Sequence, residues 1–314
     1  MDSIEEKRVY GDRAGAVTAY VASAMGIVRV RVAGDTVGEF GLCERCSTRD
    51  IAAGPAAVAI ATDEDVRVLA LEDGAGTNRS GGDGGDDENV GDASLATEEE
   101  TFVGTGFGPA VAVGYDDDGD LLAADPDGRV ACQAADSSEW TTLADETVAP
   151  VRAIDGDLVG TADGVYRVQD GGLNHAGLTD VRDVSAAGVP LAATTDGLYK
   201  LGNGWMAVLE GGFDTVGADP RSEPGRLVRA HAVTDETIYE YVPDDDAWRE
   251  SDRSTDSVIG FSYGETTYAV TEQGAFLAGV GRPGGTAHVG SDGEWRTRTL
   301  GVRDVTGIAI PQRE

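Results

Sequence analysis

The sharpest local motif of the chain is a pair of cysteines, Cys43 and Cys46, separated by two residues. Two thiolates at this spacing can supply half of a tetrahedral zinc site, or they can form a redox pair. A structural zinc site needs a second pair of ligands, and the remaining cysteine and the histidines are scattered at Cys132, His175, His231 and His288. A metal or redox site at Cys43 and Cys46 is therefore one interpretation, and a structural or incidental pair is the other.

Arginines recur at the start of several similar short segments. They are Arg49, Arg152, Arg182 and Arg303, and three of them are followed by aspartates, at Asp50, Asp183 and Asp304. If these segments are the inner strands of a ring, the four guanidiniums lie around one mouth of its channel. There they could bind a carboxylate or phosphate anion. The alternative is a repeated structural latch, in which each arginine pairs with an aspartate of the adjacent unit.

The chain contains none of the common catalytic or nucleotide-binding motifs. The nucleophile elbow G-x-S-x-G, the P-loop, the Rossmann fingerprint and H-E-x-x-H are all absent, and histidine is nearly absent. Carboxylates are so numerous that no pair stands out as an acid and base. We therefore name no catalytic residue and expect no cofactor.

The composition is strongly acidic, with 57 Asp and Glu against 24 Lys and Arg, a net charge of −33, and lysine only at Lys7 and Lys200. This pattern is typical of proteins from extreme halophiles, because molar salt shortens the Debye length to about 3 Å and screens self-repulsion. The lack of a basic stripe argues against a nucleic-acid partner.

The longest apolar stretch, residues 55–61, is too short to cross a membrane, and residues 1–12 lack a signal-peptide pattern. We therefore expect a cytoplasmic protein with no membrane contact.

The elements that must position these residues are repeated. The clearest copies, residues 158–168 and 191–201, each read as an apolar strand, an acidic turn with glycine, and a second strand. An Asp-Gly step between alternating apolar residues predicts a hairpin whose turn needs a positive φ.

Seven such turns follow one another along the chain. They fall at Gly26, Asp65, Gly128, Gly164, Gly197, Thr237 and Gly274, with spacings of 39, 63, 36, 33, 40 and 37 residues. The one long spacing contains residues 72–100, which are rich in Gly, Asp, Ser and Glu and nearly free of apolar side chains. We predict that residues 72–100 are a disordered acidic loop, inserted between the third and fourth strands of the second unit.

Each unit supplies two further strand segments. The outer ones carry the four tryptophans, Trp140, Trp205, Trp248 and Trp295, which we expect to pack against the neighbouring unit. The innermost ones are residues 47–53, 150–155, 180–186, 256–262 and 301–307. Four short strands per 35 to 40 residues are typical of propeller blades.

The two ends of the chain complement each other. The segment at 301–307 has no hairpin after it, and the first hairpin has no inner segment before it. The sequence therefore predicts an all-β, seven-bladed β-propeller. It is a single domain over residues 1–314, whose C-terminal strand completes the first blade and leaves no open sheet edge at the junction.

The Val-Arg-Asp-Val inner segments, the Ala-Asp-Gly-Val-Tyr-Arg-Val hairpin and the Asp/Gly-rich insertion resemble an uncharacterised family of haloarchaeal β-propellers over essentially the full length. The resemblance implies the fold and a cytoplasmic setting in a haloarchaeon, and it implies no activity. We expect a monomeric protein-interaction platform with a protein partner. The alternatives are a small-ligand or anion sensor at an arginine-lined channel mouth, and a hydrolase or lyase.

Overall fold

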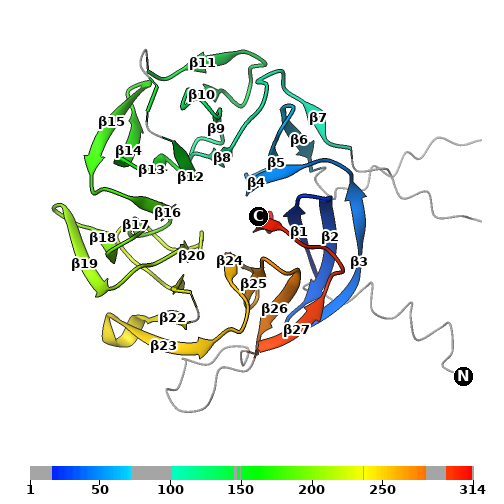
Figure 1. Cartoon of the computed structure of the whole chain (residues 1–314), viewed down its shortest axis with the longest axis vertical. Coiled ribbons are helices and arrows are strands. Elements are labelled where there is room, and N and C mark those ends of the chain that lie inside the picture. The colour runs from blue at the N-terminus through cyan, green and yellow to red at the C-terminus, as the bar shows by residue number, and fades with distance from the viewer. Residues whose placement is uncertain are drawn as a thin grey trace, which may run out of the picture.

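The computed structural model describes residues 16–71, 101–144, 147–148, 150–235, 237–280 and 295–312. The loop predicted at residues 72–100 lies outside these ranges. The described residues form seven four-stranded antiparallel sheets, arranged as the blades of a ring (Figure 1).

The blades follow one another along the chain, and the strands of each blade are named from the innermost to the outermost. Blade 1 contains β28 (Val305–Ala309), β1 (Val17–Ser23), β2 (Gly26–Ala33) and β3 (Thr36–Glu44). Blade 2 contains β4 (Thr48–Ala53), β5 (Ala57–Thr62), β6 (Val66–Ala70) and β7 (Val103–Gly104). Blade 3 contains β8 (Ala112–Tyr115), β9 (Leu121–Ala124), β10 (Val130–Gln133) and β11 (Trp140–Thr142). Blade 4 contains β12 (Val151–Asp155), β13 (Leu158–Thr161), β14 (Gly164–Gln169) and β15 (Gly172–Gly177).

The remaining three blades have the same order. Blade 5 contains β16 (Val181–Ser185), β17 (Leu191–Thr194), β18 (Gly197–Leu201) and β19 (Trp205–Glu210). Blade 6 contains β20 (Thr215–Ala218), β21 (Ala230–Val233), β22 (Thr237–Val242) and β23 (Ala247–Arg253), with a 3-10 turn at Pro243–Asp245. Blade 7 contains β24 (Val258–Tyr263), β25 (Thr267–Thr271), β26 (Ala275–Gly279) and β27 (Trp295–Thr299).

The ring is closed as the sequence predicts. β28 pairs antiparallel with β1, so that the C-terminal strand is the innermost strand of the first blade. Each inner strand contacts the inner strands on both sides, and β28 contacts both β24 and β4. The predicted seven-bladed propeller is therefore confirmed, and all four tryptophans lie on or at the start of outer strands.

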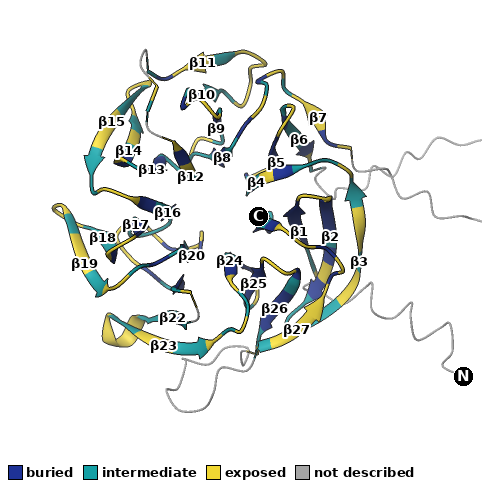
Figure 2. Ribbon diagram, in the orientation of Figure 1, coloured by how far each residue is buried: buried dark blue, intermediate teal, exposed yellow. Residues whose placement is uncertain are grey.

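Burial is highest in the second strand of each blade and falls toward the outer rim, and the inner strands that face the channel are partly exposed (Figure 2). The second strands, such as β13, β17 and β21, are buried at every residue. They are mostly apolar because neighbouring blades cover both faces of each sheet. The outer strands β19 and β27 contain no buried residue.

In most of the hairpins, a buried Ser or Thr hydroxyl forms hydrogen bonds to the backbone of the turn. In blade 4, Thr161 is fully buried, donates to the carbonyl of Gly164 at 2.9 Å, and accepts the Gly164 backbone N–H at 3.1 Å. Equivalent bonds join Ser23 to Gly26 and Thr194 to Gly197. The predicted positive φ is found at Gly26, Gly128, Gly164 and Gly274, but Gly197 has none.

The two faces of the ring differ in the loops they carry. The hairpin face, as we name it, carries the turns between second and third strands, such as the turn at Gly164. The loop face carries the connections between first and second strands, such as residues 186–190 and 219–229. Because Val181 pairs with Thr194, the start of each inner strand lies toward the hairpin face.

Candidate functional site

Two of the four predicted channel arginines bind the next blade. Arg182 in β16 forms an ion pair with Asp214, which precedes β20. Arg152 in β12 donates to the Val181 carbonyl at 2.9 Å and lies 3.8 Å from the Asp180 carboxylate. Both arginines are the extra residue of a β-bulge in an inner strand. This is the geometry of the structural latch.

The other two arginines have different surroundings. Arg49 is the bulge residue of β4, is exposed, and has no hydrogen bond or ion pair to another described residue. Arg303 precedes β28 instead of lying in it, because Thr306 occupies the bulge position of that strand. The repeated Val-Arg-Asp-Val pattern thus shifts by three residues in blade 1. The four guanidiniums do not occupy equivalent places around the channel.

The aspartates that follow these arginines also join blades. Asp183 accepts the Val216 backbone N–H of blade 6 at 2.8 Å, and Asp50 accepts that of Val113 in blade 3 at 2.9 Å. Burial among the inner strands, which outweighs these hydrogen bonds, raises the pKa of both carboxyls to about 7. Both side chains are partly exposed in the channel, so this inner ring is polar and acidic. Its hydrogen bonds give it a structural role.

The two cysteines of the Cys-x-x-Cys motif lie at the end of the outer strand of blade 1. Cys43 donates to the Ile27 carbonyl at 3.4 Å, and both thiols pack against the apolar cluster that contains Ile60. Burial first, and then the Glu44 charge, raise the pKa of Cys46 to about 11. The thiol is therefore the stable form at neutral pH, whereas zinc ligation and thiol exchange need the thiolate. Among the described residues, no three His, Cys, Asp or Glu side chains are grouped to hold a metal.

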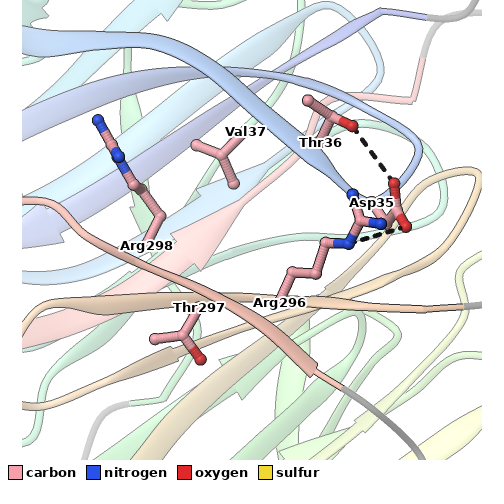
Figure 3. A pocket seen from close by; sticks show the side chains of 6 residues that line it. All are labelled: Asp35, Thr36, Val37, Arg296, Thr297 and Arg298. Carbon is pink, nitrogen blue, oxygen red and sulfur yellow. Dashed lines mark hydrogen bonds and ion pairs between the residues drawn. The ribbon is translucent and has the colours of Figure 1, made fainter.

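Two hollows lie on the outer rim. One, of about 180 Å³, separates the β2–β3 turn from β27, where Arg296 binds Asp35 at 3.2 Å (Figure 3). The other, of about 430 Å³, lies between blades 6 and 7 and has Ile238, Leu277 and Trp295 in its lining. Both are open depressions with mixed polar and apolar walls. Neither brings together the groups expected of a catalytic centre.

Among the described connections between first and second strands, the longest is on the loop face of blade 6. The connection between β20 and β21, residues 219–229, is longer than the corresponding connections at 54–56, 116–120, 156–157, 186–190 and 264–266. It reaches toward blade 5, where the Gly225 N–H donates to the Gly188 carbonyl at 2.9 Å and Leu227 is buried. Because functional sites usually break the symmetry of a repeat fold, this loop is the best candidate in the described structure.

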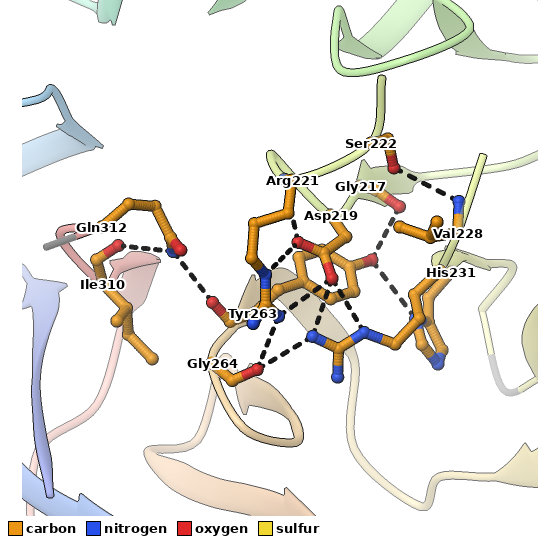
Figure 4. Close-up of polar contacts among 11 residues, drawn as sticks. Gly217, Asp219, Arg221, Ser222, Val228, His231, Tyr263, Gly264, Ile310 and Gln312 are labelled. Carbon is orange, nitrogen blue, oxygen red and sulfur yellow. Dashed lines mark hydrogen bonds and ion pairs between the residues drawn. The ribbon is translucent and has the colours of Figure 1, made fainter. Parts of the chain in front are cut away.

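A buried carboxylate anchors the start and the end of this loop (Figure 4). The side chain of Asp219 is 3% exposed and accepts hydrogen bonds from the Arg221 Nε at 2.9 Å and the Arg229 Nε at 2.8 Å. Both guanidiniums also donate to the Gly264 carbonyl of blade 7, at 2.6 Å and 2.9 Å. Burial would raise the pKa of Asp219, but these hydrogen bonds outweigh it and hold the pKa below its ordinary value. The loop is thus tied to blade 7 by a charged network.

Beneath this network, His231 and Tyr263 form a buried pair. The Tyr263 hydroxyl donates to the Gly217 carbonyl at 2.7 Å, so the His231 Nδ1 at 3.2 Å from that oxygen carries the proton and donates to it. The His231 ring stacks on Phe261, with 5.1 Å between ring centroids. Burial and the nearby Arg229 charge lower the pKa of His231 to about 3. The imidazole is therefore neutral and acts as a structural donor.

The neutral His231 predicts a pH dependence of stability. The unfolded chain binds a proton on this residue below about pH 6.5, whereas the folded protein does so only near pH 3. Stability from His231 is therefore present above about pH 6.5 and is lost as the pH falls, by about 2 kcal/mol at pH 5. Denaturation of the wild type and of His231→Asn at pH 8 and pH 5 checks this. The wild type should lose about that much more stability than the variant.

The matched control for this measurement is the exposed His175. His175→Asn should retain the pH dependence of the wild type, because that ring lies at the surface. If His231→Asn and the wild type lose equal stability between the two pH values, the conclusion that His231 is buried in its neutral form is wrong.

Sequence reasoning did not single out the Asp219 network. Its carboxylate and arginines lie within residues 219–229, but the Gly264 carbonyl belongs to another blade, and none of these residues belongs to the repeated pattern. One signal was present, since the spacing of 40 residues between the turns at Gly197 and Thr237 exceeds the preceding spacing of 33. The excess falls on residues 219–229.

No helix in the described part of the chain is long and apolar enough to span a membrane. The solved structures that resemble the chain share its fold at low sequence identity. One is the crystal structure of a nidogen/laminin complex, with a TM-score of 0.55, 11% identity, and coverage of 95% of this chain and 99% of that one. Another is the WD40 β-propeller domain of Doa1, with a TM-score of 0.57, 14% identity, and coverage of 92% and 90%.

No curated protein matches the sequence. A family model described as "HVO_0234-like, beta propeller" matches residues 3–311, nearly the whole chain. The resemblance seen in the repeats is thereby confirmed. The chain belongs to the HVO_0234-like beta-propeller family.

Proposed function

We propose that this propeller is a protein-interaction module and that its binding surface is the loop face around residues 219–229. The observation that carries the proposal is the loop itself, which breaks the repeat and is held between blades 5 and 7 by the Asp219 network and by the Gly225–Gly188 hydrogen bond. A surface fixed before binding loses little conformational entropy when a partner docks.

The residue types on this surface support a protein partner. The loop contains three arginines against two carboxylates, in a chain whose net charge is −33. Its exposed Arg226 lies near Tyr241, whose ring is 5.7 Å from that of Trp248. Arginine, tyrosine and tryptophan are the residues that most often dominate the binding energy of protein interfaces.

The fold is compatible with such a role. One solved structure of the same fold comes from a complex of nidogen with laminin, and this similarity concerns the fold alone. In the described structure, the rim hollows are open and the channel mouth has two of its four arginines bound to aspartates. These features favour an interaction surface over an enclosed ligand site. The cytoplasmic location, the monomeric state and the adaptation to salt stay predictions from the sequence.

Affinity purification from a lysate at high salt tests the proposal. The wild type should retain a stoichiometric protein partner, and Arg226→Glu should lose it, because the reversed charge stands on the proposed surface. Cross-linking followed by mass spectrometry should place the partner on residues 219–229.

The matched control is Arg49→Glu, which reverses an exposed arginine on the hairpin face. This variant should retain the partner. Loss of the partner with Arg49→Glu and retention with Arg226→Glu would overturn the proposed surface and favour the channel mouth.

A further inference from the structure

The guanidiniums of Arg221 and Arg229 are fixed in place but are not saturated. Each uses its Nε and Nη2 atoms to bind Asp219 and the Gly264 carbonyl. Neither Nη1 atom has a partner among the described residues. Four N–H donors therefore remain available on two groups whose orientation is already set.

The hydrogen-bonded network holds two guanidiniums and one carboxylate, that of Asp219. Glu240 in β22, which is partly buried, also acts on Arg229. Of the two arginine side chains, that of Arg221 is the more exposed, at 49% against 28% for Arg229.

We propose that Arg221, backed by Arg229, is the receptor for a carboxylate group of the partner protein, either a side chain or a C-terminus. This inference rests on the proposed function, and it names the chemistry of the partner at the same surface. The N–H groups left on Nη1 of the fixed Arg221 guanidinium can donate a charge-assisted hydrogen bond to a carboxylate oxygen.

Other anions fit this place less well. A phosphate dianion or a nucleic acid would bring further negative charge to a chain of net charge −33. In molar salt, long-range attraction is screened, so that only a direct contact such as this one contributes. The exposed side of Arg221 allows that contact without unfolding the loop.

The probes for this receptor are two short capped peptides that differ only in a central Glu or Gln. They are titrated into the full chain carrying ¹⁵N-arginine, in molar potassium chloride, with the side-chain N–H signals of Arg221 and Arg229 observed by NMR. The Glu peptide should shift these signals saturably and bind about tenfold more tightly than the Gln peptide, the value of one charge-assisted hydrogen bond. Equal binding of the two peptides, or no saturable shift with either, would overturn the inference.

Variants of Arg221 distinguish binding of the carboxylate from a purely structural role in the loop. Arg221→Gln should lose the preference for the Glu peptide, and Arg221→Lys should retain part of it, since lysine keeps the charge but not the planar fork. Thermal unfolding of both variants shows whether the loop still folds. If Arg221→Gln is folded and keeps the full preference, Arg221 is not the receptor. Inorganic phosphate that binds as tightly as the Glu peptide would overturn the assignment to carboxylates.

The outcomes for this inference and for the proposed function are separable. Retention of the protein partner by Arg221→Gln, together with its loss by Arg226→Glu, would overturn the carboxylate receptor and leave the interaction surface standing. Retention by both variants would overturn both.

Discussion

Replacing Asp219 by alanine is expected to lower the free energy of unfolding by about 3 kcal/mol. The side chain of Asp219 is 3% exposed, and its two oxygens accept every charged hydrogen bond between the start and end of the loop. Its removal takes away the one carboxylate that both Arg221 and Arg229 bind by hydrogen bonds. The two arginines are partly exposed and regain water, so the expected loss lies at the lower end of the range for broken buried ion pairs. Urea denaturation at constant salt measures it.

The matched control is Asp245→Ala on the same blade. Asp245 pairs with Arg249 at 2.6 Å, but the two side chains are 46% and 43% exposed. Exposed pairs of this kind contribute about 0.5 kcal/mol. Equal losses for Asp219→Ala and Asp245→Ala would contradict the structural role of the buried carboxylate.

The consequence of Asp219→Ala should also be local. The network joins β20 of blade 6 to the Gly264 turn of blade 7, and Gln312 beyond β28 donates to the adjacent Tyr263 carbonyl at 2.9 Å. Hydrogen exchange should therefore accelerate first at residues 219–229 and at the turn of blade 7. The backbone amides of blades 2 and 3, on another part of the ring, should keep their protection from hydrogen exchange when the variant and the wild type are compared at equal global stability.

The propeller could be predicted from the sequence because its signals are local and repeated. A hairpin such as residues 158–168 contains its own turn glycine and two apolar strands, and seven copies with a regular spacing leave little choice of fold. The closing strand β28 was predictable for the same reason, since it matches the inner segment that the first hairpin lacks. The repeat, and not any single residue, carried this prediction.

The candidate site could not be predicted in the same way, because its contacts cross between blades. Nothing near Asp219 in the sequence indicates that its arginine partners also bind the carbonyl of Gly264. The shift of Arg303 out of the inner strand is a related case. The Val-Arg-Asp-Val sequence suggests that Arg303 takes the bulge position of its inner strand, as Arg182 does. However, Ser23 pairs with Val305, and Thr306 is therefore the bulge residue. Register is set by the paired strand and by the closure of the ring.

The second large effect is expected for Gly164→Ala, in the hairpin turn of blade 4. Gly164 has a φ of +138°, a region that residues with a Cβ rarely adopt. A Cβ at this position would lie 2.5 Å from the Leu178 carbonyl oxygen and 2.6 Å from that of Gly177. Strain and steric overlap together should lower the free energy of unfolding by about 3 kcal/mol or more. Denaturant unfolding measures this loss.

Gly171→Ala separates the overlap from the strain alone. Gly171 lies in the next turn of the same blade, with a φ of +73°, and no atom lies within 4 Å of the position its Cβ would take. The substitution should cost only about 1 kcal/mol, the strain of a left-handed residue. The difference between the two variants measures the overlap with the connection at Leu178 together with the different backbone strain at a φ of +138°. Equal costs would show that the backbone can move away from Leu178. The glycine that recurs in these turns would then be required only for its backbone conformation, and not for the space around it.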